Sequence, residues 1–238
     1  MPAQTVGMIG IGQLGLPVAA NLIQRGFALV GYRRSNGAQF ERCGGVMLSS
    51  PAEVVQHADL VLLCLPGETA QLEVLGAANG VLAAVKPGQI VIEMATYRRD
   101  FKLEQLRRLQ AAGARTLEVE VSGSPPMVVQ RKAALYVGGS AQLAAECKPL
   151  LDAISELHFH IGELGSAVAM KLIANYLLTI HTLAAAEAMN LGACLGLDPQ
   201  RIIEAIRPGA GGSTMFSIRA PMMAARSEEH TSELQSPI

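Results

Sequence analysis

Short apolar runs alternate with amphipathic, helix-like stretches from the start of the chain to about Gly162. The runs expected to form strands are Val6–Ile9, Ala28–Tyr32, Leu60–Leu65, Ile90–Met94, Thr116–Val119 and Leu135–Val137. The helices expected between them include Leu14–Arg25, Glu53–Ala58 and Phe101–Ala111. Ser50, Pro51 and Glu53 are spaced as an N-cap, a first-turn proline and a capping-box acid, which is typical of a helix start. Strands interleaved with helices predict βαβ units and a mostly parallel sheet, the α/β class.

The hydrophobic pattern changes after Gly162. From Leu164 to Leu195 the chain has no proline and is dominated by alanine, leucine and methionine, which predicts one helix about 45 Å long. This helix is apolar on nearly all sides, so other helices or a second subunit must cover it, and we expect a homo-oligomer. Asp198-Pro199 begins a further expected helix, Gln200–Ile206, and Ser213–Ala224 forms another.

Composition favours a folded, soluble protein without a nucleic-acid or membrane partner. Half of the 238 residues are apolar and 16% are charged, which is enough for a buried core. A net charge of −1 without basic clusters argues against nucleic acid and anionic membranes. No apolar run of about 18 residues is free of Lys, Glu, Asn or His, which argues against a membrane span.

The four cysteines and the first residues bear on location. The cysteines form no C-x-x-C pair, so we expect reduced thiols and no metal site; they are Cys43, Cys64, Cys147 and Cys194. Met1–Thr5 lacks the charged start of a secretory signal. Together these features predict a cytoplasmic location.

The most specific motif is a glycine loop directly after the first expected strand. Gly10-Ile-Gly12-Gln13-Leu14-Gly15 fits G-x-G-x-x-G between a strand and a helix. Gly10 permits the tight turn, Gly12 lets backbone amides approach a pyrophosphate, and Gly15 allows the helix to pack closely on the strand. The phosphate charge then lies at the positive N-terminus of the helix. The motif predicts a Rossmann-type, doubly wound dinucleotide-binding fold; the alternative is a purely structural βα turn.

The end of the second expected strand indicates which dinucleotide binds. An NAD-binding protein would place an acid there to hold the ribose 2′-hydroxyl. This chain has Arg33, Arg34 and Ser35 instead. Guanidinium groups and a hydroxyl suit a 2′-phosphate, so NADP(H) is preferred and NAD(H) remains possible. The alternative is that both arginines face solvent.

The stretch from Met8 to Leu22, MIGIGQLGLPVAANL, resembles the opening signature of the β-hydroxyacid dehydrogenases. These include 3-hydroxyisobutyrate dehydrogenase and tartronate semialdehyde reductase, with 6-phosphogluconate dehydrogenase as a larger relative. The resemblance extends from about Thr5 to Ala224. It implies a dinucleotide-binding domain followed by an all-helical domain that one long helix begins. We therefore expect an NADP-binding domain at 1–162 and an incomplete helical domain at 163–225.

Further motifs follow in the order and spacing of that family. Leu65-Pro66 resembles the strand-end loop that passes under the cofactor, and Thr96 is similar to a threonine that approaches the nicotinamide riboside. Ser122-Gly123-Ser124 resembles the loop that binds the substrate carboxylate. The segment after Gly162 resembles the catalytic segment, in which Lys171 and Asn175 face the substrate.

The spacing of Lys171 and Asn175 suits the chemistry that the resemblance implies. Residues four apart lie one turn apart on one helix face, so an ammonium and an amide can reach one small ligand. Hydride transfer to a carbonyl carbon requires a proton on the carbonyl oxygen, and a partly desolvated lysine fits that general acid/base role. The alternative for Lys171 is a solvated helix face, but its neighbours, Ala167 to Ile173, are otherwise apolar.

Departures from the family pattern limit the choice of substrate. Ser124, Met127 and Arg131 stand where the family has glycine, and Ala167 and Ala174 replace a glycine and an asparagine. Arg131 and Lys132 add positive charge, which suits a larger or more acidic substrate unless both face solvent. We therefore expect only a small carboxylate-bearing hydroxyacid or semialdehyde.

Two other functions stay open. The first alternative is a catalytically silent NADP-binding scaffold. The second is an enzyme similar to the imine reductases, which share this fold. In imine reductases the catalytic lysine is typically replaced, so Lys171 argues against the second alternative.

The residues from Arg226 onward have neither helical periodicity nor turn residues in a usable order. The run Arg226–Ser236 matches the translation of a common sequencing adapter, so we interpret 226–238 as a non-native tail. The resemblance implies that the family continues past Ala225 with further helices, including a lysine that reaches the cofactor.

Overall fold

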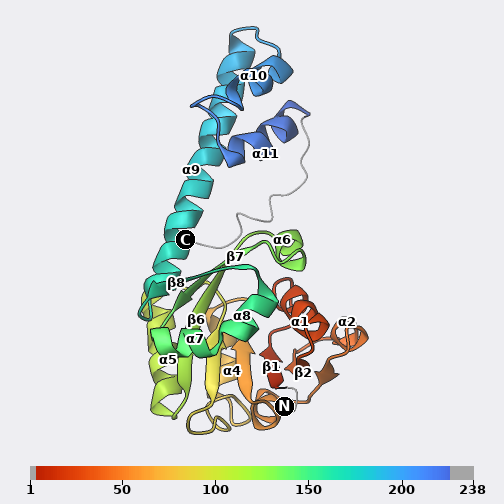
Figure 1. Cartoon of the computed structure of the whole chain (residues 1–238), viewed down its shortest axis with the longest axis vertical. Helices are drawn as coiled ribbons and strands as arrows, with labels where there is room; N and C mark the ends of the chain where they lie inside the picture. Colours follow the sequence, from red (N-terminus) through yellow and green to blue (C-terminus); the bar gives the residue numbers. More distant parts are fainter. Residues whose placement is uncertain (1–3, 226–238) are drawn as a thin grey trace. The chain divides into compact units, whose positions relative to one another are not determined.

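The computed structural model describes residues 4–225, which divide into one compact unit ending at Lys171 and another beginning at Leu172. The strands of the first unit are β1 (Thr5–Ile9), β2 (Ala28–Tyr32), β3 (Val46–Met47), β4 (Leu60–Leu63), β5 (Ile90–Glu93), β6 (Arg115–Ser122), β7 (Ala134–Gly138) and β8 (Leu157–Gly162). They form one sheet in the order β3-β2-β1-β4-β5-β6-β7-β8 (Figure 1). All neighbouring strands are parallel except β6 and β7. The strand order reverses between β1 and β4, which confirms the doubly wound, mostly parallel arrangement.

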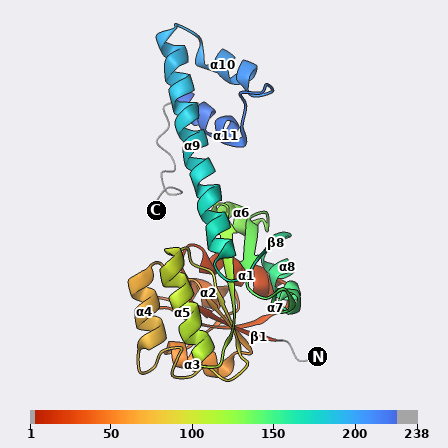
Figure 2. The ribbon, with the colours of Figure 1, turned by 90° about the vertical axis from the view of Figure 1, so that its left-hand side faces the viewer.

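Helices cover both faces of this sheet. They are α1 (Gly15–Gln24), α2 (Ala38–Arg42), α3 (Pro51–His57), α4 (Glu68–Gly76), α5 (Arg99–Ala111), α6 (Pro125–Val129), α7 (Ala141–Glu146) and α8 (Lys148–Ile154). Figure 2 shows α3, α4 and α5 on one side of the sheet and α7 and α8 on the other. Helices on both faces bury the side chains of the central strands, which is why β4 is apolar throughout and β1 and β5 are largely apolar.

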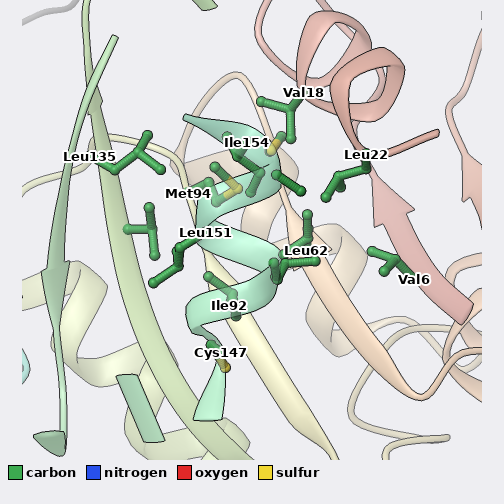
Figure 3. Packing of buried hydrophobic residues seen from close by; sticks show 14 of the residues in the cluster. Val6, Val18, Leu22, Leu62, Ile92, Met94, Leu135, Cys147, Leu151 and Ile154 are labelled. Carbon is green, nitrogen blue, oxygen red and sulfur yellow. The ribbon is translucent and has the colours of Figure 1, made fainter. Parts of the chain in front are cut away.

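Two apolar clusters form the core, one on each face of the sheet. On the face of α1 and α8, Val18, Leu22 and Leu151 pack against strand residues such as Leu62 and Ile92 (Figure 3). The opposite cluster joins α3, α4 and α5 to the sheet through Val54, Leu75, Leu109, Ile9, Val61 and Val91. Both clusters include residues of β1, β4 and β5, so the strands that lead into the segments at their carboxyl ends are firmly packed.

The six expected strands are confirmed, and β3 and β8 extend the sheet at its two edges. The expected helix start at Ser50 is also confirmed, because Ser50 Oγ accepts a hydrogen bond from Glu53 N at 3.2 Å. Strand β4 was expected to run from Leu60 to Leu65, but it ends at Leu63. The chain turns there into the segment that approaches the glycine loop.

The second unit is helical. The long helix α9 (Ser166–Cys194) begins in the first unit, and α10 (Pro199–Ile206) and α11 (Thr214–Ala224) follow it. In the second unit α9, α10 and α11 share a small core that contains Ala185, Met189, Ile202, Ile203, Phe216 and Ala220. Gly192 lets α10 approach closely, because a side chain there would overlap Ile202. Met189 is therefore part of the core of this unit.

The surface of α9 remains apolar over much of its length. By length and mean hydropathy alone this helix meets the criteria for a membrane span, as core helices of soluble proteins also do. Large apolar side chains between 172 and 191 are more than 40% exposed in the described structure, namely Ile173, Tyr176, Leu177, Ile180, Leu183 and Leu191. The expected non-native tail at 226–238 lies outside the described residues.

Candidate active site

The glycine loop lies at the point where the strand order reverses. Gly10 follows β1, has a φ of +97°, and approaches the chain after β4 so closely that a side chain would overlap the Cys64 carbonyl. At Gly15 a side chain would overlap the Gly10 carbonyl. Gly12, Gln13 and Leu14 form the loop between them, and α1 begins at Gly15. The loop therefore turns tightly onto a helix N-terminus, at the edge where open α/β sheets bind ligands.

A cavity of about 350 Å³ lies beyond the carboxyl end of β2. It is lined by Arg33, Ser35, Asn36, Ala38, Gln39 and Arg42. Arg33 Nε donates a hydrogen bond to Ser35 Oγ at 3.1 Å, which orients the guanidinium. Arg34 instead pairs with Glu73 of α4, with 3.2 Å between Nη1 and Oε2, and both side chains are exposed. Of the two expected arginines, only Arg33 lines the cavity, and Arg42 of α2 joins it.

Three more expected cofactor or substrate segments follow neighbouring parallel strands. Leu65-Pro66 follows β4, Thr96 follows β5, and Ser122 ends β6. Backbone hydrogen bonds of 2.8 Å from Cys64 N to Ile9 O and from Met94 N to Leu63 O continue the strand pairing into these segments. Since parallel strands end at one edge of a sheet, these segments lie along the same edge as the glycine loop. Leu65 is buried, whereas Pro66 is exposed and Thr96 and Ser122 are half-buried.

Thr96 is anchored to a buried charge that the sequence analysis did not single out. Its Oγ1 donates a 2.6 Å hydrogen bond to Glu120 Oε2. Glu120 in turn pairs with the ammonium of Lys102, and Glu93 and Glu118 complete a fully buried group of one lysine and three glutamates. The signal available in the sequence was the alternation of Glu118 and Glu120 with the apolar residues Leu117, Val119 and Val121, since a charge buried in such a run needs a partner.

Lys171 lies on α9, one turn after the start of that helix. The first turn is held by Glu118, whose Oε1 accepts hydrogen bonds from Gly165 N at 2.6 Å and Ala167 N at 2.9 Å. Ala167 and Val168 are buried, whereas Leu172 and Ile173 are 40% and 56% exposed. The apolar residues expected around Lys171 are therefore buried before it and exposed directly after it in the chain, and Lys171 itself is half-buried. Asn175 follows one turn later on α9 and is also half-buried.

The substrate loop, Ser122-Gly123-Ser124, joins β6 to α6. Gly123 has a φ of +155°, and a side chain there would contact Ala133 at 2.9 Å. The loop is thus shaped by the glycine and by the two prolines that begin α6. On the other side of α6, Asn21 of α1 donates to the Val128 carbonyl, which ties the loop to the helix that begins at the glycine motif.

Arg131 does not belong to the substrate loop. It has a φ of +58°, and its guanidinium donates to the Ala153 and Asp152 carbonyls at the end of α8 and pairs with Glu156. The structure therefore assigns Arg131 to packing. Lys132 is exposed, as the solvent-facing alternative requires.

The residues of this edge fit a dinucleotide. No atom lies within 4 Å of the position that a Gly12 side chain would occupy, so the loop backbone is open to a pyrophosphate. The cavity lined by Arg33 and Arg42 lies beyond the carboxyl end of β2, where the adenosine ribose of a bound dinucleotide would lie. Among residues 4–225, no cluster of three or more His, Cys, Asp or Glu side chains has the arrangement of a metal site.

Comparison with known proteins agrees with this geometry. A family model described as the NAD-binding domain of 6-phosphogluconate dehydrogenase matches residues 5–162. A second, described as NAD-binding of NADP-dependent 3-hydroxyisobutyrate dehydrogenase, matches residues 165–236. The chain is 33% identical to the mitochondrial 3-hydroxyisobutyrate dehydrogenase of Rattus norvegicus over 87% of its own length, and spans 62% of that relative. It is also 33% identical to the L-threonate dehydrogenase of Cupriavidus necator, over 92% of this chain and 75% of the relative.

Solved structures give the same result. The 3-hydroxyisobutyrate dehydrogenase of Mycobacterium tuberculosis, solved with L-serine, superposes with a TM-score of 0.86 at 26% identity, over 92% of this chain and 75% of that one. An imine reductase of Myxococcus stipitatus with NADP⁺ superposes at 0.75 with 18% identity, over 85% and 71% of the two chains, which shows a shared fold alone.

Proposed function

The chain belongs to the β-hydroxyacid dehydrogenase family of NAD(P)-dependent oxidoreductases, and we propose that it acts on a small hydroxyacid or semialdehyde that carries a carboxylate. The observation that carries this proposal is the placement of the glycine loop, Leu65-Pro66, Thr96 and Ser122 after neighbouring parallel strands. A start of α9 that is hydrogen-bonded to the same sheet supports it.

The reaction divides between the cofactor and the side chains of the chain. When bound, the nicotinamide supplies or accepts the hydride. Lys171 then donates a proton to the substrate oxygen during reduction and removes one during oxidation. Asn175, on the same face of α9, orients the substrate oxygen or the lysine.

The substrate carboxylate is assigned to the loop after β6. Ser122 offers a hydroxyl, and the backbone amides near Gly123 and Ser124 offer further donors to an anion. Because Arg131 is engaged with the end of α8, the positive charge of this loop does not come from that guanidinium. A small substrate anion is therefore favoured over a large polyanionic one.

We propose NADP(H) as the preferred cofactor. The support is the cavity that Arg33 and Arg42 line with Ser35, since two guanidiniums and a hydroxyl match the oxygens of a 2′-phosphate. None of the residues that line this cavity is a carboxylate that could hold a free 2′-hydroxyl.

We also propose that the complete protein is a homo-oligomer. The support is the row of exposed apolar side chains on α9, among them Ile173, Tyr176 and Ile180, which a monomer would leave in water. Light scattering tests this: a monodisperse monomer of the complete protein contradicts it. A cytoplasmic location stays a prediction from the sequence.

The activity is tested with purified protein, NADPH and three classes of compound: carboxylate-bearing semialdehydes, glyoxylate and cyclic imines. Oxidation of NADPH by the first two classes alone supports the proposal. Turnover of imines favours an imine reductase. Tight NADPH binding without turnover of any compound favours the silent scaffold.

A further inference from the structure

One lysine and three glutamates are buried together between α5 and the sheet. Lys102 comes from α5, Glu93 from β5, and Glu118 and Glu120 from β6. All four side chains are no more than 1% exposed. Lys102 Nζ lies 2.9 Å from Glu93 Oε2 and 3.9 Å from Glu118 Oε2, and it is in direct contact with Glu120 Oε1.

Sheet register explains how three carboxylates meet. Glu93 and Glu118 are partners in the pairing of β5 with β6, and Glu120 lies two residues further on the same face. On the neighbouring strand, Gly138 is the partner of Glu118, and a side chain there would overlap its carboxylate. The sheet thus leaves room for the charges.

Each carboxylate also has a partner outside the group, and these partners belong to the candidate active site. Glu120 Oε2 accepts from the Thr96 hydroxyl at 2.6 Å, and Glu93 Oε1 accepts from Ala95 N at 2.8 Å. Glu118 Oε1 accepts from Gly165 N and Ala167 N at the start of α9. One ammonium therefore lies within ion-pair distance of the acids that hold both the Thr96 segment and the helix that carries Lys171.

Burying three acids with one ammonium does not favour the stability of the fold. Three acids share one buried ammonium, and burial raises the pKa of Glu93 to about 7 against the opposing effect of Lys102. The pKa of Glu118 is raised for the same reason. Buried ion pairs contribute little net stability compared with apolar packing, so stability does not account for this arrangement.

We propose that Lys102 is a positioning residue that, through Glu93, Glu120 and Glu118, holds the Thr96 segment and the first turn of α9 in one fixed arrangement. The proposal rests on the proposed function in one respect, namely that Thr96 and Lys171 serve binding and turnover. The connection from Lys102 through the glutamates to the Thr96 segment and the first turn of α9 involves only residues of the first unit. It can therefore be measured without any substrate.

The first experiment is amide hydrogen exchange on the protein without cofactor. In Lys102→Met, exchange at Gly165, Ala167 and Ala95 is expected to rise about fivefold to tenfold, because the three acids lose their common partner. Exchange in β1 is expected to stay the same. The matched control is Lys148→Met, which removes an exposed ammonium from its pair with Asp152 on α8 and should change none of these amides.

A pair of variants at Glu118 separates the hydrogen bonds from the charge. Glu118→Gln keeps an oxygen that accepts from Gly165 N and Ala167 N, so protection of the first turn of α9 should be retained. Glu118→Ala removes the acceptor, and protection there should be lost. This pair tests whether Glu118 holds the start of α9, and it does so even if Lys102→Met does not fold: equal protection of α9 in both Glu118 variants overturns the proposal.

Binding and turnover complete the test. Titration by NADPH fluorescence should give a several-fold higher Kd in Lys102→Met, and with a turned-over semialdehyde kcat should fall while KM for that compound changes little. Unchanged exchange at the three amides in folded Lys102→Met overturns the proposal whatever the activity. Altered exchange and NADPH binding in a protein that turns over no compound would instead uphold the link and count against the proposed function.

Discussion

The side-chain amide of Asn21 joins the cofactor helix to two other helices. Its Nδ2 donates to the Val128 carbonyl at 2.7 Å and to the Ile154 carbonyl at 3.1 Å, and the residue is 3% exposed. Val128 lies in the last turn of α6, the helix after the substrate loop, and Ile154 ends α8. One amide therefore fixes α1, which begins at the glycine motif, against both neighbours.

Asn21→Leu should lower the free energy of unfolding by about 2 kcal/mol, because a side chain of similar size leaves two buried carbonyls without that donor. Urea unfolding followed by circular dichroism measures this. Asn79→Leu, at an exposed position, is the control and should change stability little. If both variants are equally stable, the bonds of Asn21 do not stabilise the fold.

Lys171→Ala should reduce kcat by about 10²-fold or more, the usual contribution of general acid–base catalysis. NADPH affinity, measured by fluorescence, should change little because the proton transfer is lost rather than the cofactor site. Asn175→Ala should reduce the rate less. Near-normal turnover in Lys171→Ala would remove the role assigned to this lysine.

Arg33→Ala and Arg42→Ala should each weaken NADPH binding by about tenfold or more and leave NADH binding nearly unchanged, because each loses a charge-assisted contact to the 2′-phosphate. Arg34→Ala is the matched control, since Arg34 pairs with Glu73 outside the cavity. Fluorescence titrations with the two cofactors measure the selectivity. Equal loss of NADPH and NADH affinity, or an initial preference for NADH, contradicts the assignment.

Stability should depend on pH through Glu93. Its pKa is raised from 4.5 to about 7, chiefly by burial, so between these values the folded protein keeps a proton that the unfolded chain releases. Raising the pH through this window therefore favours unfolding, by up to roughly 3 kcal/mol once the pH exceeds the folded pKa. The charged groups that face Glu93 are Lys102, Glu118 and Glu120, and the Cys64 thiol and Tyr97 lie beside it.

Glu93→Gln should remove this contribution. Urea unfolding near pH 5.5 and near pH 8 should give a smaller loss of stability in the variant than in the unmodified protein. Glu104→Gln, an exposed residue of the same helix as Lys102, should leave the difference unchanged. A variant that loses stability as steeply as the unmodified protein would show that Glu93 is ionised throughout.

Features that depend on near neighbours in the chain were predictable. The glycine motif determined the turn after β1, and Ser50, Pro51 and Glu53 determined the start of α3, because each acts within a few residues. The long apolar run determined α9 in the same way. The order of strands and helices then restricted the sheet to a doubly wound arrangement.

Only the tertiary structure decided which distant side chains meet. Strand register brings Glu93 beside Glu118, and α5 places Lys102 among them, although no local pattern relates these positions. Packing likewise turns Arg131 to the end of α8 and adds Arg42 to the cavity of Arg33. Charged side chains are long and their partners lie in other elements, so their contacts follow from the packing of whole elements and not from sequence spacing.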